Sequence, residues 1–378
     1  MPVNKCRVCG SKFFKAPLLR YGNMPRAAQY LPDKSGLKKD KAMRLEIRQC
    51  SGCGLVQLNS QPVPYYKEVI RASGVSEEMK AFRKKQFSGL VQNFSLKNKK
   101  IIEIGCGRGE YLSIMQKCPL KAYGLEYSKI SVNYCVKNGL KVSKGFIDNA
   151  DYKLNKGPFA AFYILSFLEH LPEPNSVLKG IFNNLEDGAI GLVEVPNFNM
   201  ILKNNLFSEF ISDHILYFTR ETLEFTLRLN GFDIIDCSEV WKDYIISCLV
   251  RKRKSLDLAH FGKHKSRLKK EIENYLRRFK NKKIAVWGAG HQAFAAISLM
   301  GMGGKIRYVV DSAAFKQGKY TPATHIPIVP PDRLKADPAD AIIVMAAGYS
   351  DEVARIIRKD FGASLNIAIL RDFGLEVV

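Results

Sequence analysis

The stretch KKIIEIGCGRGEYLSIM, residues 99–115, decides the fold of the central part of the chain. A short apolar run leads into a glycine-rich loop, and an amphipathic helical pattern follows the loop. Gly105, Gly107 and Gly109 let a ligand approach the backbone at the N-terminus of that helix. The pattern predicts an α/β fold, in which a doubly wound parallel sheet holds a nucleotide-like cofactor at this loop.

Polar side chains lie at the ends of the predicted strands around this loop. Glu103 is on the strand before the loop, and the second strand, in AYGLEYS, ends at Glu126. An acid at that strand tip can accept hydrogen bonds from both hydroxyl groups of a ribose. After a third strand, GFIDNADY offers Asp148 and Asn149 to the edge of an adenine, and FAAFYILSFLEHL fits a fourth strand.

The order E-x-G-x-G-x-G, with the acid that follows it, resembles the class I S-adenosylmethionine-dependent methyltransferases. The resemblance implies that S-adenosylmethionine is the cofactor of this part of the chain. An NAD-binding Rossmann domain is the structural alternative. In that motif the third glycine falls three residues after the second, whereas Gly109 follows Gly107 by two.

Two C-x-x-C pairs frame the N-terminal segment. CRVCG holds Cys6 and Cys9, and CSGCGLVQL holds Cys50 and Cys53. A glycine follows each second cysteine, which suits the tight turn that directs two thiolates at one ion. Four thiolates would close a tetrahedral zinc site with a structural role. Redox-active pairs, or a segment that has lost its metal, are the alternatives.

The C-terminal part repeats the strand–glycine turn–helix pattern. KIAVWGAGHQAFAAISLMGM contains Gly288 and Gly290, and IRYVVDS is a strand that ends at Asp311. These features predict a second doubly wound, Rossmann-like unit. It lacks E-x-G-x-G-x-G, so we expect no second S-adenosylmethionine site, but the glycine loop can hold a phosphate.

Composition and charge limit the remaining possibilities. The chain has 378 residues, nine cysteines and a formal net charge of +23. We find no apolar run that could cross a membrane and no export signal, so we expect a cytoplasmic protein with reduced thiols. The basic residues concentrate in 251–283, which we interpret as a solvated linker helix. Binding of a polyanion, or attraction of an anionic substrate, is the alternative for this run.

The order of these parts resembles the nucleotide-sugar C-methyltransferases, which methylate C-3 of 4-keto-6-deoxyhexoses attached to thymidine diphosphate. LLRYGNMPRAAQYLP and CSGCGLVQL are similar to the family's N-terminal segments, and VDSAAFKQGKYTPATHIPI is similar to its C-terminal stretch. The resemblance implies a nucleotide-sugar substrate, no membrane or nucleic-acid partner, and a monomer or homodimer. Its expected parts are a zinc-binding domain (1–75), the methyltransferase domain (76–250), the basic linker helix (251–283) and a Rossmann-like substrate-binding domain (284–378).

The resemblance also implies catalytic residues. The family's Tyr-His-Glu-His run aligns with Ile211, Ser212, Asp213 and His214, and its histidine at the end of the fourth strand aligns with His170. His214 is then the base that deprotonates C-3, Asp213 the acid that orients it, and His170 its helper. The family's tyrosine and first histidine are absent here.

Further residues follow from the same resemblance. In PYYKEVIRASGVSEEMKAF, Tyr66 and Ser73 match a lid over the cofactor. The expected contacts to the nucleotide-sugar come from the C-terminal unit, and His325 is either a loop residue or a further contact. The residues expected to bind substrate are Gly288, Gly290, His291, Gln292, Lys316, Lys319 and Tyr320.

Two other functions remain open. The first is an O- or N-methyltransferase that acts on a nucleotide-sugar or a phosphorylated metabolite, because an oxygen acceptor needs a base but no partner for an enolate. The second is a zinc-containing nucleic-acid-binding protein or an RNA methyltransferase, which the basic charge and the two cysteine pairs suggest.

Overall fold

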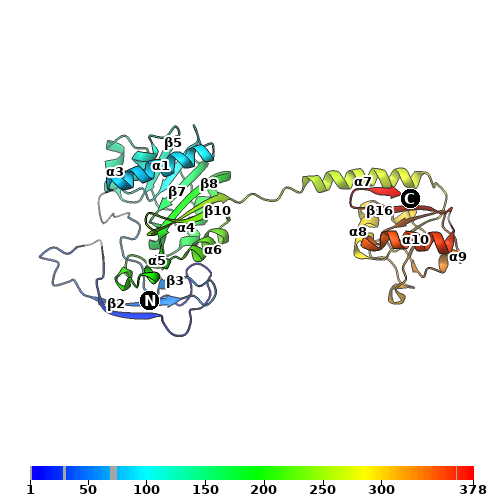
Figure 1. Ribbon diagram of the computed structural model, residues 1–378, viewed down its shortest axis with the longest axis horizontal. Coiled ribbons are helices and arrows are strands. Elements are labelled where there is room, and N and C mark those ends of the chain that lie inside the picture. Colours follow the sequence, from blue (N-terminus) through cyan, green and yellow to red (C-terminus); the bar gives the residue numbers. More distant parts are fainter. Residues whose placement is uncertain (1, 29–30, 69–74, 363) are drawn as a thin grey trace. The chain divides into compact units, whose positions relative to one another are not determined.

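The chain forms two compact units, Met1–Ser255 and Leu256–Val378, each with its own β-sheet and hydrophobic core (Figure 1). The computed structural model describes residues 2–28, 31–68, 75–362 and 364–378. None of the helices within these ranges has the length and apolar character needed to span a bilayer.

A seven-stranded sheet forms the centre of the first unit. Its strand order is β10-β11-β8-β7-β4-β5-β6. The five strands from β8 to β6 are parallel, β11 is antiparallel to β8, and β10 is antiparallel to β11. The strands are β4 Lys100–Ile104, β5 Lys121–Glu126, β6 Val142–Lys144, β7 Phe159–Leu165, β8 Leu185–Pro196, β10 Phe232–Val240 and β11 Ile245–Lys252. This arrangement confirms the predicted class I methyltransferase fold.

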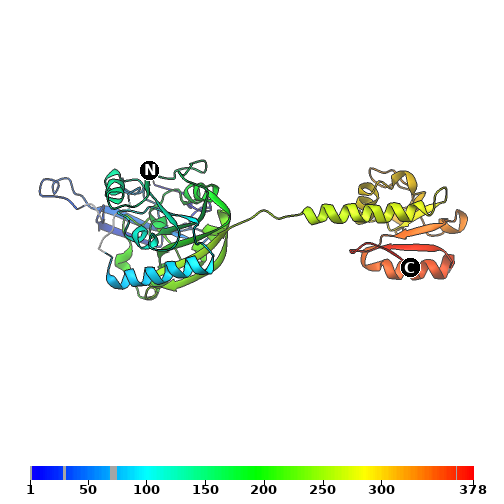
Figure 2. The ribbon, with the colours of Figure 1, turned by 90° about the horizontal axis from the view of Figure 1, so that it is seen from above.

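Helices cover both faces of this sheet, as a doubly wound fold requires. Figure 2 shows α1, in cyan, alongside the sheet. Along β7, Tyr163 and Leu165 pack with α1, α2 and α3, whereas Phe162 and Ile164 pack with α4 and α6. Side chains alternate between the faces because successive residues of a strand point to opposite sides. The helices are α1 Glu77–Asn93, α2 Glu110–Met115, α3 Lys129–Lys137, α4 Pro174–Asn183, α5 Phe198–Lys203 and α6 Arg220–Leu229.

A second sheet of the first unit joins the N-terminal segment to a distant part of the chain. Its order is β1-β2-β3-β9, formed by Leu19–Met24, Met43–Gln49, Val56–Leu58 and Leu216–Tyr217. Strand β9 begins two residues after His214, and Val56 pairs with Tyr217. The cysteine-bearing segment is therefore built onto the methyltransferase core, and it packs against the run that holds the predicted base.

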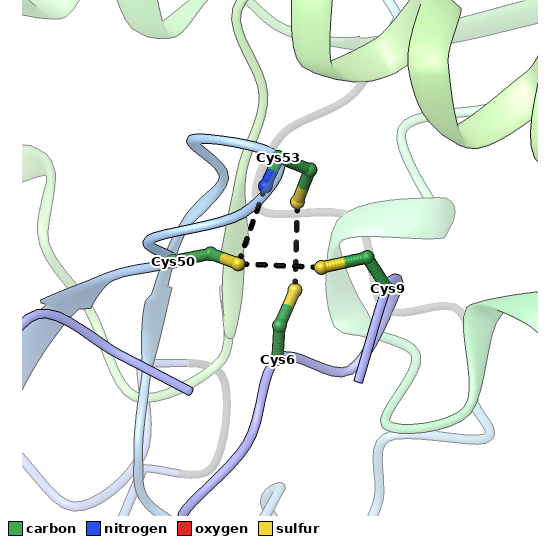
Figure 3. A group of neighbouring side chains, drawn as sticks. All are labelled: Cys6, Cys9, Cys50 and Cys53. Atoms are coloured by element: carbon green, nitrogen blue, oxygen red, sulfur yellow. Dashed lines mark hydrogen bonds between the residues drawn. The ribbon is translucent and has the colours of Figure 1, made fainter. Parts of the chain in front are cut away.

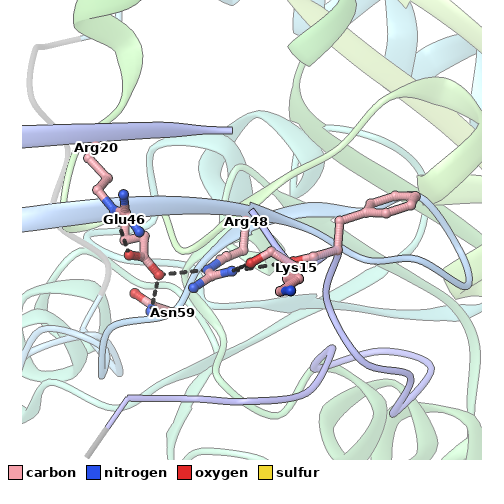
Figure 4. Close-up of polar contacts among 6 residues, drawn as sticks. Lys15, Arg20, Glu46, Arg48 and Asn59 are labelled. Carbon is pink, nitrogen blue, oxygen red and sulfur yellow. Dashed lines mark hydrogen bonds and ion pairs between the residues drawn. The ribbon is translucent and has the colours of Figure 1, made fainter. Parts of the chain in front are cut away.

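Side-chain hydrogen bonds connect β1 to β2 (Figure 4). The Glu46 carboxylate accepts hydrogen bonds from Arg20 Nε at 3.1 Å, Arg48 Nε at 2.6 Å and Asn59 Nδ2 at 2.9 Å. Partial burial opposes ionisation of Glu46, but the two arginines outweigh it and lower its pKa. Arg48 also donates to the carbonyl of Lys15 at 3.0 Å, so one side chain connects β2 to the chain after the first cysteine pair.

The second unit is a six-stranded Rossmann-like sheet of order β14-β13-β12-β15-β16-β17, parallel except for β17. Its strands are β12 Ile284–Trp287, β13 Tyr308–Val310, β14 Ile328–Val329, β15 Ala341–Val344, β16 Asn366–Leu370 and β17 Leu375–Val377. Its helices are α7 Ala259–Arg277, α8 His291–Leu299, α9 Arg333–Ala336 and α10 Ser350–Phe361.

The basic helix α7 is shorter than expected, and it is not solvated on all sides. Residues 251 and 252 end β11, and the helix begins at Ala259. Leu268, Ile272 and Leu276 lie in the core of the second unit. Because these positions recur at helical spacing, one face of α7 is apolar while its lysines and arginines occupy the other faces.

Candidate active site

The glycine loop follows β4 as the sequence predicts, and two of its glycines are sterically required. Gly105 has a φ of +71°, and a Cβ there would lie 2.7 Å from the Phe167 ring. Gly109 has a φ of +80° and is the N-cap of α2, where a Cβ would lie 2.3 Å from Leu140. Left-handed backbone is costly for other residues, so the loop conformation depends on these glycines.

The two predicted acids lie beside this loop. Glu126, at the end of β5, accepts hydrogen bonds from the backbone N–H groups of Gly107 and Ser128, both at 2.9 Å. Glu103, on β4, accepts a hydrogen bond from the Tyr163 hydroxyl at 3.0 Å. Glu126 therefore holds the loop backbone, and Glu103 holds the neighbouring strand β7.

A hollow beside the loop is lined by aromatic residues that the motif did not reveal. Its wall includes Gly105, Tyr127, Phe146 and Phe167. The ammonium of Lys67 lies 5.0 Å from the centre of the Phe146 ring and 5.5 Å from that of Tyr127, distances typical of cation–π contacts. These residues carry no recognisable signal in a single sequence.

The other residues predicted to bind the cofactor are Asp148, Asn149, Tyr66 and Ser73. Asp148 and Asn149 are exposed and joined by a hydrogen bond of 2.8 Å between Asn149 Nδ2 and Asp148 Oδ1. Tyr66 stacks edge-on against Phe146, with ring centres 5.9 Å apart. Ser73 lies outside the described residues. The described members of the predicted set therefore surround one end of the parallel sheet.

The side chains of the two predicted catalytic histidines are in contact, although the residues are 44 positions apart in the sequence. The rings of His170 and His214 are 4.7 Å apart between centres, edge to face. His170 ends a 3₁₀ turn, Leu168–His170, rather than the strand itself, because β7 ends at Leu165. Burial lowers the pKa of His170, and burial together with His170 lowers the pKa of His214 to about 3. Both imidazoles are therefore neutral at neutral pH.

The carboxylate of Asp213 has a different role from the one expected. It accepts hydrogen bonds from the Ala28 N–H at 2.8 Å, the Tyr65 hydroxyl at 2.7 Å and the Ser212 hydroxyl at 3.2 Å. The acid that was expected to orient His214 instead binds residues of the N-terminal segment. Only its backbone carbonyl faces the histidines, 2.8 Å from Nδ1 of His170.

Ile211, which stands in place of the family tyrosine, is half-buried. Its N–H donates to the Tyr217 hydroxyl at 3.0 Å. The phenolic hydroxyls that contact this run thus belong to Tyr217 and Tyr65, which the sequence alone does not single out. Tyr65 is adjacent to the predicted Tyr66, and no local pattern distinguishes the two.

Glu169 is a further residue that the sequence analysis did not select. Its side chain is fully buried, and neither carboxyl oxygen has a hydrogen-bond partner among the described residues. Burial raises its pKa to about 8. Oε1 lies 3.8 Å from Nε2 of His170, and ligand-type atoms of Glu169, His170 and His214 all lie within 4.8 Å of one another. Such a group can exchange protons or hold a metal ion.

The four predicted cysteines converge, as Figure 3 shows. The sulfurs of Cys6 and Cys53 are 3.6 Å apart, and those of Cys9 and Cys50 are 3.3 Å apart. All four sulfurs lie within 4.8 Å of one another. Two pairs of thiols from separate turns surround one point, which is the ligand set of a tetrahedral zinc site.

Both cysteine turns have the backbone that thiolates require. Gly10 and Gly54 have φ values of +73° and +80°, as the position after each second cysteine predicts. The N–H of Gly52 donates to the Cys50 sulfur at 3.3 Å, and that of Val8 donates to the Cys6 sulfur at 3.4 Å. The hydrogen bond between Cys6 and Cys53 lowers the pKa of Cys6 to about 5 and raises that of Cys53, so Cys6 is the thiolate of this pair.

The C-terminal unit places its glycine turn and its strand-end acid together. Asp311 accepts hydrogen bonds from the N–H groups of Ala289 and Ala313, and it pairs with Lys316 at 3.0 Å. Gly288 has a φ of +115°, and a Cβ there would lie 2.5 Å from the Met345 carbonyl. Gly290 is the N-cap of α8. Five of the residues considered for substrate binding have exposed side chains: His291, Gln292, Lys319, Tyr320 and His325.

Three family models match consecutive parts of the chain. Residues 79–236 match "Methyltransferase domain", and residues 252–364 match "C-methyltransferase C-terminal domain". Residues 6–64, which contain all four cysteines, match "Putative zinc binding domain". The matches occur in the order that the sequence resemblance implies.

Individual relatives cover different shares of the chain. The chain is 22% identical to the C-methyltransferase NovU of Streptomyces niveus, over 93% of this chain and 91% of NovU. It is 23% identical to the tRNA U34 carboxymethyltransferase of Aliarcobacter butzleri, over 43% of this chain and 57% of that protein. A solved S-adenosylmethionine-dependent methyltransferase from Aquifex aeolicus is 18% identical, covers 46% of this chain and 98% of its own, and has a TM-score of 0.35.

The sheet topology, the glycine loop and the matched domain between α1 and β10 define an S-adenosylmethionine-dependent methyltransferase. A cysteine-bearing domain precedes this domain and a domain described as a C-methyltransferase C-terminal domain follows it. The chain carries these three matched domains in this order, and its similarity to the C-methyltransferase NovU spans 93% of its length.

Proposed function

We propose that this methyltransferase acts on a nucleotide-linked keto-deoxysugar, of the thymidine diphosphate type, and methylates C-3 after His214 removes the proton there. The main support for the proposal is the contact between His170 and His214, whose ring centres are 4.7 Å apart. Both histidines lie in the same unit as the glycine loop. A neutral imidazole is the form that can accept a proton. Carbon beside a ketone becomes nucleophilic when that proton leaves.

The proposed cofactor residues hold S-adenosylmethionine, which supplies the methyl group when bound. Glu126 accepts hydrogen bonds from the ribose hydroxyls, and Asp148 and Asn149 face the adenine. The backbone of Gly105, Gly107 and Gly109 leaves room for the cofactor's chain, with Glu103, Tyr66 and Ser73 completing the site. The position of the glycine loop and of Glu126 at the carboxyl ends of adjacent parallel strands supports this assignment.

The proposed metal is one structural zinc ion, held by Cys6, Cys9, Cys50 and Cys53. Four cysteine ligands leave no open coordination position, so the ion takes no part in the chemistry. Since β9 adds to the sheet that carries these cysteines, zinc binding would also stabilise the chain next to His214. Metal binding and the position of the base are therefore connected.

The proposed site for the nucleotide is the glycine turn of the C-terminal unit. The diphosphate would meet the backbone N–H groups at the start of α8, whose dipole favours an anion. The residues assigned to it are Gly288, Gly290, His291, Gln292, Lys316, Lys319 and Tyr320. The pairing of Lys316 with Asp311 means that Lys316 would contact the nucleotide only if it changed partner.

The test is product analysis with a panel of thymidine-diphosphate 4-keto-6-deoxyhexoses, with and without S-adenosylmethionine. We expect the protein alone to exchange the C-3 proton in deuterated water, and the complete reaction to add one methyl group at C-3. A panel in which no sugar exchanges its C-3 proton or gains a methyl group would exclude the carbon acceptor.

The second candidate is methyl transfer to an oxygen or nitrogen atom of a nucleotide-sugar or phosphorylated metabolite. Ile211 favours it, because its side chain carries no hydroxyl to stabilise an enolate oxygen. The exchange assay separates the two, since only the carbon acceptor must lose its C-3 proton. A nucleic-acid substrate has less support, because the tRNA-modifying relative matches 43% of this chain whereas NovU matches 93%.

A further inference from the structure

Glu169 is the described acid whose placement the proposed reaction does not explain. A fully buried carboxyl group normally has hydrogen-bond partners, because an unsatisfied polar group costs free energy. Both oxygens of Glu169 lack such partners among the described residues, and its exposure is 1%. Its backbone is held, since the N–H of Ile215 donates to its carbonyl at 3.0 Å. The side chain is thus kept beside the histidines by the fold.

The tautomer of His170 follows from its contact with Asp213. A carbonyl oxygen only accepts, so the proton of His170 must be on Nδ1, which lies 2.8 Å from the Asp213 carbonyl. Nε2 therefore has a free lone pair, and it is 3.8 Å from Oε1 of Glu169. After a shift of less than 1 Å the protonated carboxyl group of Glu169 could donate a hydrogen bond to this nitrogen, whereas the carboxylate could not.

The group next to Glu169 is the base itself. A carboxyl oxygen of Glu169 and a ring nitrogen of His214 lie within 4.8 Å of each other. The other titratable groups near Glu169 are His170 in its own turn, Asp213 in the following run, and Tyr244, whose pKa burial raises with contributions from Glu209 and Glu169. Among the described residues no lysine or arginine makes an ion pair with Glu169.

We infer that Glu169 is a positioning residue for methyl transfer: its carboxylate, held beside His214, stabilises the imidazolium that His214 becomes. This inference rests on the proposed function. When His214 takes the proton from C-3, the electron pair of the C–H bond remains as the enolate. That pair then forms the bond to the methyl carbon, the S–CH₃ bond breaks toward sulfur, and the proton on His214 leaves to water.

The inference predicts a particular pH dependence. Burial holds the pKa of Glu169 near 8, so the carboxylate form is populated above that pH. A negative charge within 4.8 Å favours the protonated imidazole. The rate of C-3 proton exchange should therefore rise with pH to a plateau above about 8.

The test compares C-3 proton exchange, without S-adenosylmethionine, for wild type, Glu169→Gln and Glu169→Asp between pH 6 and 9.5. Glu173→Gln is the matched control, because Glu173 is exposed and lies in the same loop. We expect Glu169→Gln to lower the plateau rate about 10- to 100-fold and to remove the rise with pH. Glu169→Asp should keep the rise at a reduced rate, and Glu173→Gln should behave as wild type.

Three results would overturn the inference. One is an unchanged pH profile in Glu169→Gln while wild type exchanges. Another is exchange that needs an added divalent ion such as Mn²⁺, with binding of that ion lost in Glu169→Gln, which would make the group a metal site. The third is loss of zinc or of cooperative unfolding in Glu169→Asp as well as Glu169→Gln, which would make the role structural. Absence of exchange in wild type would instead contradict the proposed function.

Discussion

The backbone carbonyl of Asp213 lies 2.8 Å from Nδ1 of His170, while the carboxylate of the same residue binds Ala28 and Tyr65. One residue therefore faces the histidines with its main chain and the N-terminal segment with its side chain. The proposed base, His214, therefore follows a residue that is held by Ala28, 185 positions earlier in the sequence than Asp213.

Asp213→Asn should weaken these contacts without removing the residue's bulk. An amide has only one accepting oxygen, so it cannot accept hydrogen bonds from both the Ala28 N–H and the Tyr65 hydroxyl in the present geometry. We expect a loss of about 1–3 kcal/mol in the free energy of unfolding, together with a reduced exchange rate. Denaturant unfolding measures the first quantity. Asp236→Asn, an exposed residue of β10, should change neither, and equal losses in both variants would contradict the prediction.

The contribution of Glu169 to stability should fall as pH rises from about 6.5 to 8. The pKa of Glu169 is about 8 in the folded protein against 4.5 for a free side chain, so unfolding releases a proton in that interval. His214 works in the opposite direction, because its pKa is about 3 when folded and 6.5 otherwise. The lowered pKa of Cys6 also opposes Glu169 up to about pH 9, so the effect of Glu169 is measured as the difference between wild type and Glu169→Gln.

Between pH 6.5 and 8 wild type should lose roughly 2 kcal/mol of unfolding free energy relative to Glu169→Gln, at about 1.4 kcal/mol per pKa unit. Urea unfolding of both proteins at several pH values measures this difference. Glu169→Gln has no ionisable group at that position, so its curve lacks the contribution of Glu169. Wild-type and Glu169→Gln curves that stay parallel across this interval would show that Glu169 is already ionised in the folded protein.

The fold was predictable because its signals are local. The glycine loop, the strand-end acid Glu126 and the repeated pattern around Gly288 each specify a strand, a turn and a helix within a short stretch. The cysteine cluster was predictable for the same reason, since each turn carries its own pair of ligands. The contacts of Asp213 were not, because Ala28 and Tyr65 reach it only after β9 has joined β3 in a sheet. Glu169 looks like any acid in a turn until its burial is known.

Zinc removal should destabilise the first unit and reduce activity. We expect one zinc ion per chain in the purified protein, and none after Cys53→Ser, because three thiols leave an incomplete tetrahedron. Metal analysis and thermal unfolding with and without a chelator measure both effects. Cys118→Ser is the control, since Cys118 is outside the cluster. A metal-free protein with unchanged unfolding would contradict a structural role for zinc.

Glu126→Gln should weaken binding of S-adenosylmethionine. The carboxylate holds the N–H groups of Gly107 and Ser128, and it is proposed to accept the ribose hydroxyls. Loss of the charge should raise the dissociation constant about 10- to 100-fold, which corresponds to roughly 1.4–2.7 kcal/mol. Calorimetry with S-adenosylhomocysteine measures the change. Glu221→Gln, at an exposed position of α6, should bind as wild type, and equal affinities in all three proteins would remove Glu126 from the cofactor site.

Ile211→Tyr tests whether a hydroxyl is missing from the site. Ile211 is half-buried and lies three positions before His214, at the place where the resemblance puts a tyrosine. If carbon is the acceptor, a hydroxyl near the enolate oxygen should raise the C-3 exchange rate, by about tenfold for one added hydrogen bond of about 1.4 kcal/mol. Ile211→Phe adds the ring without the hydroxyl and is the matched control. A gain in Ile211→Phe equal to that in Ile211→Tyr would assign the effect to packing. No exchange in wild type or Ile211→Tyr, combined with methylation of a sugar hydroxyl, would identify oxygen as the acceptor.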